Sequence, residues 1–212
     1  MEPVIKKGNI KESITNLSNM VFGVALSIGA LTLINNISSI ANSGAIINNI
    51  ITFAFSFLII ISIWFRYTKA LALMKVETRI EINLNIVILF LVAVEPYLFY
   101  LLNIGTGSLV NFTSILYALD VAGLLIVLSI FYKIGIWSHK TENPEIKDYY
   151  GPVGNALLFS GILFLVSALP IFWGINVFGF QLRFVIWIVA LILGNSLRNL
   201  DRYIRRRAAN SA

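Results

Sequence analysis

Residues 14–36 read "ITNLSNMVFGVALSIGALTLINN", a polar cluster followed by an apolar run that is one membrane wide and ends in two asparagines. The run exceeds the ~7–15 apolar residues of a signal peptide, and thirteen residues precede the stretch. We therefore expect a retained membrane helix. Its small residues lie on more than one face, in the pairs Ala25/Gly29 and Gly23/Ser27, which favours a helix packed on several sides. The alternative is that glycine and alanine are simply common in membrane helices.

The whole chain shares this apolar character. Of its 212 residues, 58% are hydrophobic and 12% are charged, and its mean hydropathy is +0.85. A soluble domain of this size would carry many more charged side chains. Six apolar runs are long enough to cross ~30 Å of hydrocarbon, over approximately 15–36, 46–65, 84–103, 111–133, 153–173 and 179–197. We predict an all-α, integral membrane six-helix bundle that forms a single transmembrane domain over residues 1–212.

Basic residues indicate the orientation of this bundle. All sixteen lysines and arginines except Arg183 precede the first span, follow the sixth, or lie in the connections after the second and fourth. The other connections, 37–45, 104–110 and 174–178, hold no charged residue. The positive-inside rule then predicts cytoplasmic termini and a multi-pass protein of the cell membrane. The basic tail, with Arg202 and Arg205–Arg207, predicts anionic lipid headgroups as partners and no nucleic acid.

Signatures of enzymes and metal sites are missing from the sequence. The chain has no cysteine and one histidine, His139, in a polar loop. It contains no HExxH motif, no glycine-rich phosphate loop and no Ser/His/Asp set. We therefore expect no enzymatic activity, no catalytic residue, no metal site and no cofactor.

Three charged residues fall within the predicted spans, and such residues are functional candidates by default because burying a charge in a membrane is costly. They are Glu95, Asp120 and Arg183, all predicted at a similar depth in the outer half of the membrane. One interpretation is a structural cluster of an acid with Arg183. The other is a proton or cation relay, as in a coupled secondary transporter. Aromatic side chains near the span ends, Tyr67 among them, predict an interfacial belt.

The stretch "LSNMVFGVALSIGAL" resembles the opening of the first helix in the potassium channel family of transmembrane protein 175, with Leu17, Ser18 and Asn19 at the positions of its Phe-Ser-Asp signature. Further matches are Trp64 at the end of the second span, "NIVILFLVAVEP" in the third and "LYALDVAGLL" in the fourth. The resemblance covers most of the chain, with weaker support after residue 150.

The chain departs from that signature at its charged positions. Ser13 stands where the family has arginine, Asn19 replaces the aspartate, and Arg66–Thr68 replace the histidines expected after Trp64. If the family's arginine–aspartate pair ties the inner end of the first helix to its neighbours, we expect a neutral tie here. Losing both charges together leaves neither buried and unpaired.

The resemblance implies a homotetramer that conducts potassium passively through a pore lined by the four first helices. Bulky aliphatic rings in the family map to Val24, Ile28 and Leu31, which share one helical face. Such rings close a pore by dewetting. Ser27 would supply a hydroxyl layer and Asn35 a polar ring nearer the outer mouth. The resemblance implies K⁺ as permeant ion. From the residues alone, the alternative is that this face meets lipid or the protein core, as in a non-conducting homologue.

Overall fold

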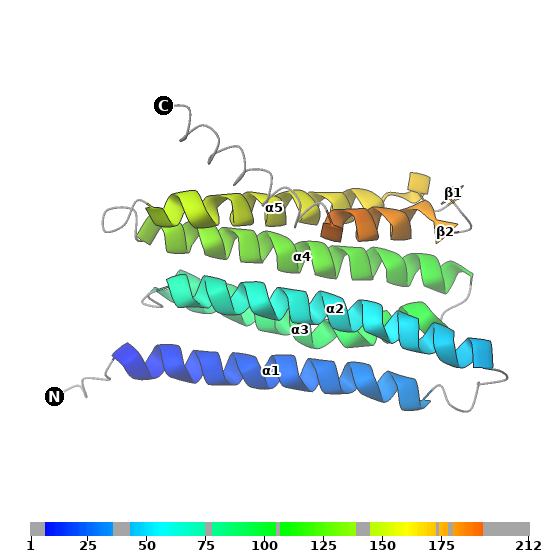
Figure 1. The fold of residues 1–212 in the computed structure, drawn as a ribbon, viewed down its shortest axis with the longest axis horizontal. Coiled ribbons are helices and arrows are strands. Elements are labelled where there is room, and N and C mark those ends of the chain that lie inside the picture. Colours follow the sequence, from blue (N-terminus) through cyan, green and yellow to red (C-terminus); the bar gives the residue numbers. More distant parts are fainter. Residues whose placement is uncertain are drawn as a thin grey trace, which may run out of the picture.

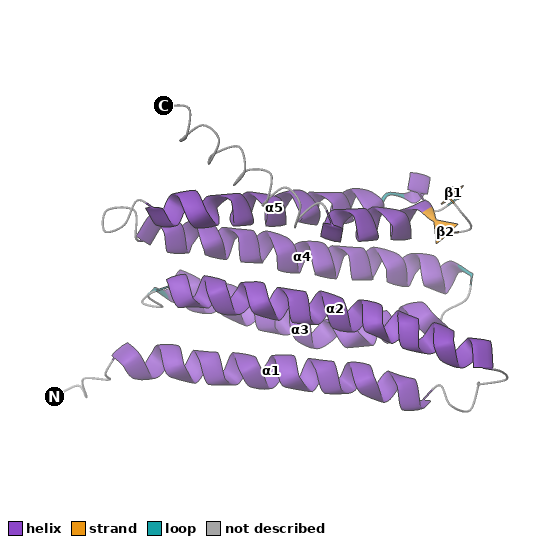
Figure 2. Ribbon diagram, in the orientation of Figure 1, coloured by secondary structure: helices purple, strands orange, loops and turns teal. Residues whose placement is uncertain are grey.

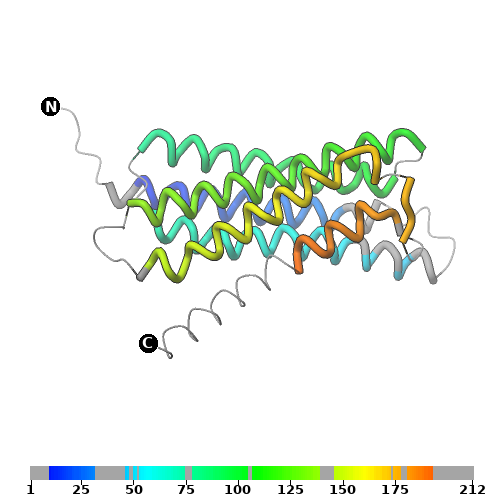
Figure 3. Tube along the Cα trace, turned by 90° about the horizontal axis from the view of Figure 1, so that it is seen from above, coloured from blue at the N-terminus to red at the C-terminus, as the bar shows by residue number. Residues whose placement is uncertain are grey.

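The computed structural model describes residues 7–35, 43–74, 78–104, 107–138, 145–172, 174–177 and 180–192. Its helices run back and forth along one long axis (Figures 1 and 3). They are α1 (Lys7–Asn35), α2 (Ser43–Leu73), α3 (Arg79–Ile104), α4 (Ser108–Ser138) and α5 (Glu145–Ser167), followed by a shorter apolar helix at Leu182–Ile192, here named the sixth helix. Five of them are long and apolar enough to cross a membrane. The predicted helical membrane bundle is thus confirmed, while the orientation of its termini stays a prediction.

Several helices extend beyond the predicted spans at one end of the bundle. α1 begins at Lys7 instead of 15, α2 ends at Leu73 instead of 65, and α5 begins at Glu145 instead of 153. All three extensions lie at the end where α1 begins (Figure 1). Hydropathy detects the apolar part of a helix, whereas the hydrogen-bonded ladder continues through good helix formers such as lysine and glutamate.

α3 starts with a reciprocal capping arrangement that the apolar pattern did not reveal. The Thr78 backbone N–H donates to Glu81 Oε2 at 2.9 Å, and the Glu81 N–H donates to Thr78 Oγ1 at 3.3 Å. This is the Thr-x-x-Glu pattern that satisfies free N–H groups at a helix N-terminus. It places the start of α3 at Arg79, five positions before the predicted 84.

The connection from α5 to the sixth helix departs from the all-α prediction. α5 ends at Ser167 rather than 173, because Pro170 lacks an N–H and opens a 3-10 turn at Pro170–Phe172. A small antiparallel hairpin follows, with β1 (Asn176–Val177) paired to β2 (Phe180–Gln181) (Figure 2). The sixth helix therefore begins at Leu182 instead of 179, and the predicted stretch 193–197 lies outside the described residues.

The helices form layers in which α1 lies at one edge. α1 packs against α2 and α3, α4 packs against α2 and α3 from the other side, and α5 packs on α4 (Figure 1). Trp187 of the sixth helix fills the space next to α4 and α5, with its ring centroid 5.0 Å from that of Tyr117 and 5.8 Å from that of Phe164. Its indole N–H donates to Ser167 Oγ at 2.7 Å, so the buried nitrogen is satisfied.

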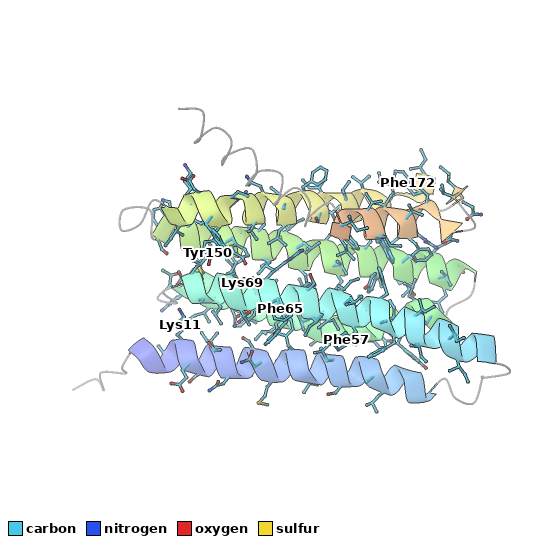
Figure 4. The ribbon with its side chains drawn as sticks, in the orientation of Figure 1. Lys11, Phe57, Phe65, Lys69, Tyr150 and Phe172 are labelled. Atoms are coloured by element: carbon cyan, nitrogen blue, oxygen red, sulfur yellow. The ribbon has the colours of Figure 1, made fainter. Side chains whose placement is uncertain are left out.

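The described basic side chains gather at one end of the bundle. Lys11 on α1 and Lys69 on α2 lie toward the end that also holds Tyr150, while Phe172 lies at the opposite end (Figure 4). Arg79, Lys133 and Lys147 belong to the same end by the antiparallel order of their helices. Arg183, in the first turn of the sixth helix, belongs to the other end.

Candidate functional site

The face of α1 that holds the predicted pore residues is left largely exposed by the described part of the chain. Val24, Ile28 and Leu31 are 54%, 41% and 54% exposed. Ser27 on the same side is also exposed, and its hydroxyl donates to the Gly23 carbonyl one turn back at 2.8 Å. Asn35 is the last residue of α1, and its side chain lies outside the described residues. One continuous exposed stripe therefore carries the three aliphatic candidates.

The opposite face of α1 is buried against the bundle. Ser18, Phe22, Ala25 and Gly29, spaced by three or four residues, lie along it. A Cβ added to Gly29 would lie 3.7 Å from a ring carbon of Phe53, so the Ala25/Gly29 pair faces the neighbouring helices. Small residues let these backbones approach closely. Within one chain, α1 is thus packed on one side rather than at the centre of the helices.

The second small pair of α1 lies on its uncovered side. Gly23 has nothing within 4 Å of an added Cβ, and its partner Ser27 is exposed. Beside this stripe, a shallow apolar hollow of about 170 Å³ separates α1 from Ala93 of α3, and its lining includes Leu17, Val24 and Ile28. The described residues pack against α1 on one side, so its packing on several sides stays a prediction.

The signature-equivalent residues divide between the two faces. Leu17 is 52% exposed and lines the hollow, whereas Ser18 is fully buried. Asn19 is exposed, and its Oδ1 accepts a hydrogen bond from the indole N–H of Trp64 at 3.2 Å. Trp64 of α2 therefore contacts Asn19 of α1.

A buried polar network ties α1 to α2 and α3 at the basic end of the bundle. The Tyr67 hydroxyl lies 2.6 Å from Ser18 Oγ and donates to Asn85 Oδ1 at 2.5 Å. Tyr67 is 0% exposed, and its ring contacts Phe22 with a centroid distance of 5.4 Å. The prediction that Tyr67 belongs to an interfacial belt is wrong. Neutral hydrogen bonds therefore join α1, α2 and α3 at this point.

Lys11 adds one charged contact to this tie. Its Nζ donates to the carbonyls of Met74 at 2.8 Å and of Ala72 at 3.2 Å. These groups belong to the last turn of α2 and the residue after it, where backbone carbonyls have no partner within the helix. A cation there also interacts favourably with the helix dipole. Lys11 therefore contacts α2 directly without needing an aspartate.

The buried acids are held by hydroxyls. Glu95 is 0% exposed and accepts hydrogen bonds from Ser56 Oγ at 3.0 Å and the Tyr117 hydroxyl at 3.1 Å. Asp120, one turn after Tyr117 on α4, is 5% exposed, and its Oδ2 has no hydrogen-bond partner in the described part of the chain. Glu95 on α3 and Asp120 on α4 belong to two helices that pack against each other.

The predicted cluster of an acid with Arg183 does not form. Arg183 donates to Asn111 Oδ1 at 3.1 Å and to Gln181, and its guanidinium carbon lies 5.2 Å from the ring centre of Phe184. Asn111 and Asp120 are nine residues apart on α4, or about 14 Å along the helix axis. Arg183 therefore sits nearer the end of the bundle than the sequence suggested, because the sixth helix begins late.

Sequence reasoning missed four partners in these networks: Lys11 as a helix cap, Asn85, Ser56 and Tyr117. Their residue types carried a usable signal, since amides and hydroxyls in apolar spans need partners. Which partner each one meets depends on the rotation of the helices about their own axes, and periodicity does not give that rotation between helices.

Together, the fold and the site define a helical membrane protein whose first helix is anchored by one face and presents an apolar stripe on the other. Residues 13–96 match the family model described as the endosomal/lysosomal potassium channel TMEM175. The matched segment holds most of α1, all of α2 and the first part of α3. The resemblance stated from the sequence is confirmed over these residues. No curated protein and no solved structure matches the chain.

Proposed function

We propose that the chain is a potassium-permeable channel in which four copies surround a pore lined by α1. The observation that carries this proposal is the apolar stripe of Val24, Ile28 and Leu31, which the described residues leave largely exposed. The family match supports ion channel activity, because the matched family is one of potassium channels. The protein would act in the cell membrane as a multi-pass protein.

In this proposal the stripe forms the gate. Rings of Val24, Ile28 and Leu31 from four copies would exclude water from the narrow part of the pore and so block ions. Ser27 and Asn35 would line adjacent polar layers. The uncovered small pair Gly23/Ser27 would then allow close approach of the neighbouring α1 helices. Anionic headgroups would contact the basic tail, and K⁺ is the expected permeant ion.

A matched pair of isoleucines tests the gate against the alternative that this stripe faces lipid. Ile28 on α1 and Ile86 on α3 are both exposed in the single chain, at 41% and 57%. In proteoliposomes with a potassium gradient, we expect Ile28→Asn to raise the passive current, because a polar ring hydrates the constriction. Ile86→Asn should leave the current unchanged. Equal effects of both variants, or of neither, would contradict an α1 pore.

Crosslinking tests the assembly independently of conduction. The chain has no cysteine, so Ser27→Cys introduces a single reactive site. Four α1 helices on a common axis should give covalent dimers on oxidation, since disulfides need Cα atoms within about 7 Å. Ile86→Cys is the control and should stay monomeric. Crosslinking with no current would identify a non-conducting homologue rather than a channel.

The second candidate function is a proton- or cation-coupled transporter, and the burial of Glu95 and Asp120 inside the bundle favours it. Acidic side chains inside a membrane bundle are common components of proton relays. This candidate predicts saturable, pH-dependent flux that is lost in Asp120→Asn and unchanged in Ile28→Asn. The channel predicts the reverse, so one set of flux measurements separates the two.

A further inference from the structure

Two adjoining cavities run along one side of α2. The first, about 440 Å³, lies toward the basic end of the bundle between α2, α4 and α5. The second, about 500 Å³, lies between α2 and the sixth helix. Leu58 and Ser62 line both cavities, so the two form one groove, here called the α2 groove. Volumes of this size are typical of small-molecule sites.

The end of the α2 groove that lies at the basic end of the bundle is lined by cationic and aromatic side chains. Arg66 and Lys69 line it from α2, and Tyr132, Tyr149 and Tyr150 line it from α4 and α5; Figure 4 labels Lys69 and Tyr150. The hydroxyl of Tyr132 donates to the Arg66 carbonyl at 2.9 Å, and the Tyr132 ring stacks on Tyr150 with centroids 6.0 Å apart. Tyr149 packs edge-on against Tyr150. Guanidinium and ammonium groups are donors suited to a phosphate oxygen.

The other end of the groove is apolar. Its lining is Phe55, Leu58, Ile188, Leu191 and Ile192, with the Ser62 hydroxyl at the junction. Ile188 and Ile192 are 48% and 59% exposed, so this part opens sideways from the bundle. Aliphatic walls of this kind accept a hydrocarbon chain and offer nothing to a soluble anion.

The length of the groove matches one leaflet of a bilayer. Its lining residues on α2 fall on one helical stripe from Phe55 to Lys69, a separation of fourteen residues. At 1.5 Å per residue this is about 21 Å. Half of the ~30 Å hydrocarbon layer is about 15 Å, which leaves several ångströms for a headgroup. The charged end lies at the level of a headgroup and the apolar end at the level of acyl chains.

We propose that the α2 groove binds a phospholipid with an anionic headgroup, with its phosphate at Arg66 and Lys69 and one acyl chain between α2 and the sixth helix. The basic residues place this end in the leaflet predicted to be cytoplasmic, where anionic lipids are concentrated. The occupant is a lipid rather than free phosphate because a soluble anion leaves the apolar half empty. This proposal does not depend on whether the protein conducts ions.

Native mass spectrometry of the detergent-purified protein tests the site with defined probes. We expect phosphatidylglycerol to be retained over phosphatidylcholine of the same acyl chains. Lys69→Gln should weaken phosphatidylglycerol binding about fivefold, the effect of one basic residue at a membrane surface. Arg79→Gln, an exposed cation at the same end on α3, is the matched control and should have no effect.

Two further arms identify the occupant. Ile188→Phe should narrow the apolar half and weaken retention of phosphatidylglycerol, and glycerol 3-phosphate should not compete with the lipid. Competition by glycerol 3-phosphate would assign the site to a soluble phosphate and overturn the lipid. Equal retention of the two lipids, or equal effects of Lys69→Gln and Arg79→Gln, would show that no anionic headgroup is selected in the groove.

Discussion

Replacing Tyr67 by phenylalanine tests the anchor that orients α1. The change removes one hydroxyl from a fully buried side chain and leaves the ring contacts with Phe22 in place. Two hydrogen bonds between helices are lost, one to Ser18 and one to Asn85. Such bonds in membrane proteins contribute about 0.6 kcal/mol on average and up to about 1.7 kcal/mol. We therefore expect the free energy of unfolding to fall by about 1–3 kcal/mol.

A loss in the upper part of that range is expected because the change leaves the buried Asn85 amide without its Tyr67 partner. Asn85 is 3% exposed, so its amide loses a partner where no bulk water replaces it. The measurement is equilibrium unfolding in mixed micelles with increasing dodecyl sulfate, followed by circular dichroism. Tyr97→Phe is the matched control, because Tyr97 is 59% exposed on α3. That control should stay within about 0.5 kcal/mol of the parent protein.

A double-mutant cycle shows whether the loss comes from the anchor itself. Ser18→Ala combined with Tyr67→Phe should destabilise by less than the sum of the single changes, because both remove the same hydrogen bond. Strict additivity would mean that the two hydroxyls do not interact. A loss for Tyr67→Phe equal to that for Tyr97→Phe would refute the reasoning as a whole.

Two further predictions concern contacts elsewhere in the bundle. Gly161→Ala should lower the free energy of unfolding by about 1–3 kcal/mol, because the added Cβ would lie 2.8 Å from Ile126 Cγ1 and 3.2 Å from a backbone oxygen of α4. Gly151→Ala in the same helix meets nothing within 4 Å and should be neutral or stabilising in the same unfolding assay. Lys11→Met should cost about 0.5–2 kcal/mol by uncapping α2, whereas Lys147→Met, at an exposed position on α5, should not; equal losses would exclude the cap.

The helices could be predicted from the sequence because membrane spans must be both long and apolar. The same logic placed Val24, Ile28 and Leu31 on one face, since a period of 3.6 residues groups them. The structure agrees that these three are exposed together. Their grouping on one face follows from local helix geometry, whereas the exposure of that face follows from how α1 packs on α2 and α3.

The polar partners could not be predicted, because they depend on distances between segments. Ser18 and Tyr67 are 49 positions apart in the sequence and form a contact. The predicted depth of each residue in the membrane shows which residues lie at the same level, but it does not show which of them are in contact. For Arg183 the sequence suggested a partner, an acid, that the structure does not show. The β1–β2 hairpin delays the start of the sixth helix by three residues. Arg183 then pairs with Asn111 rather than with an acid.

The neutral anchor holds one face of α1 against the bundle without a buried ion pair. An ion pair buried between helices must recover the cost of desolvating both partners, and removing one partner leaves a buried charge. Hydroxyl and amide groups carry a smaller desolvation cost, so Ser18, Tyr67 and Asn85 join three helices with neutral hydrogen bonds. Lys11, on α1, donates to the carbonyl of Met74, the residue after α2, at the basic end of the bundle. The anchored face of α1 is thus held by contacts that need no ion pair, and the opposite stripe stays directed away from the bundle.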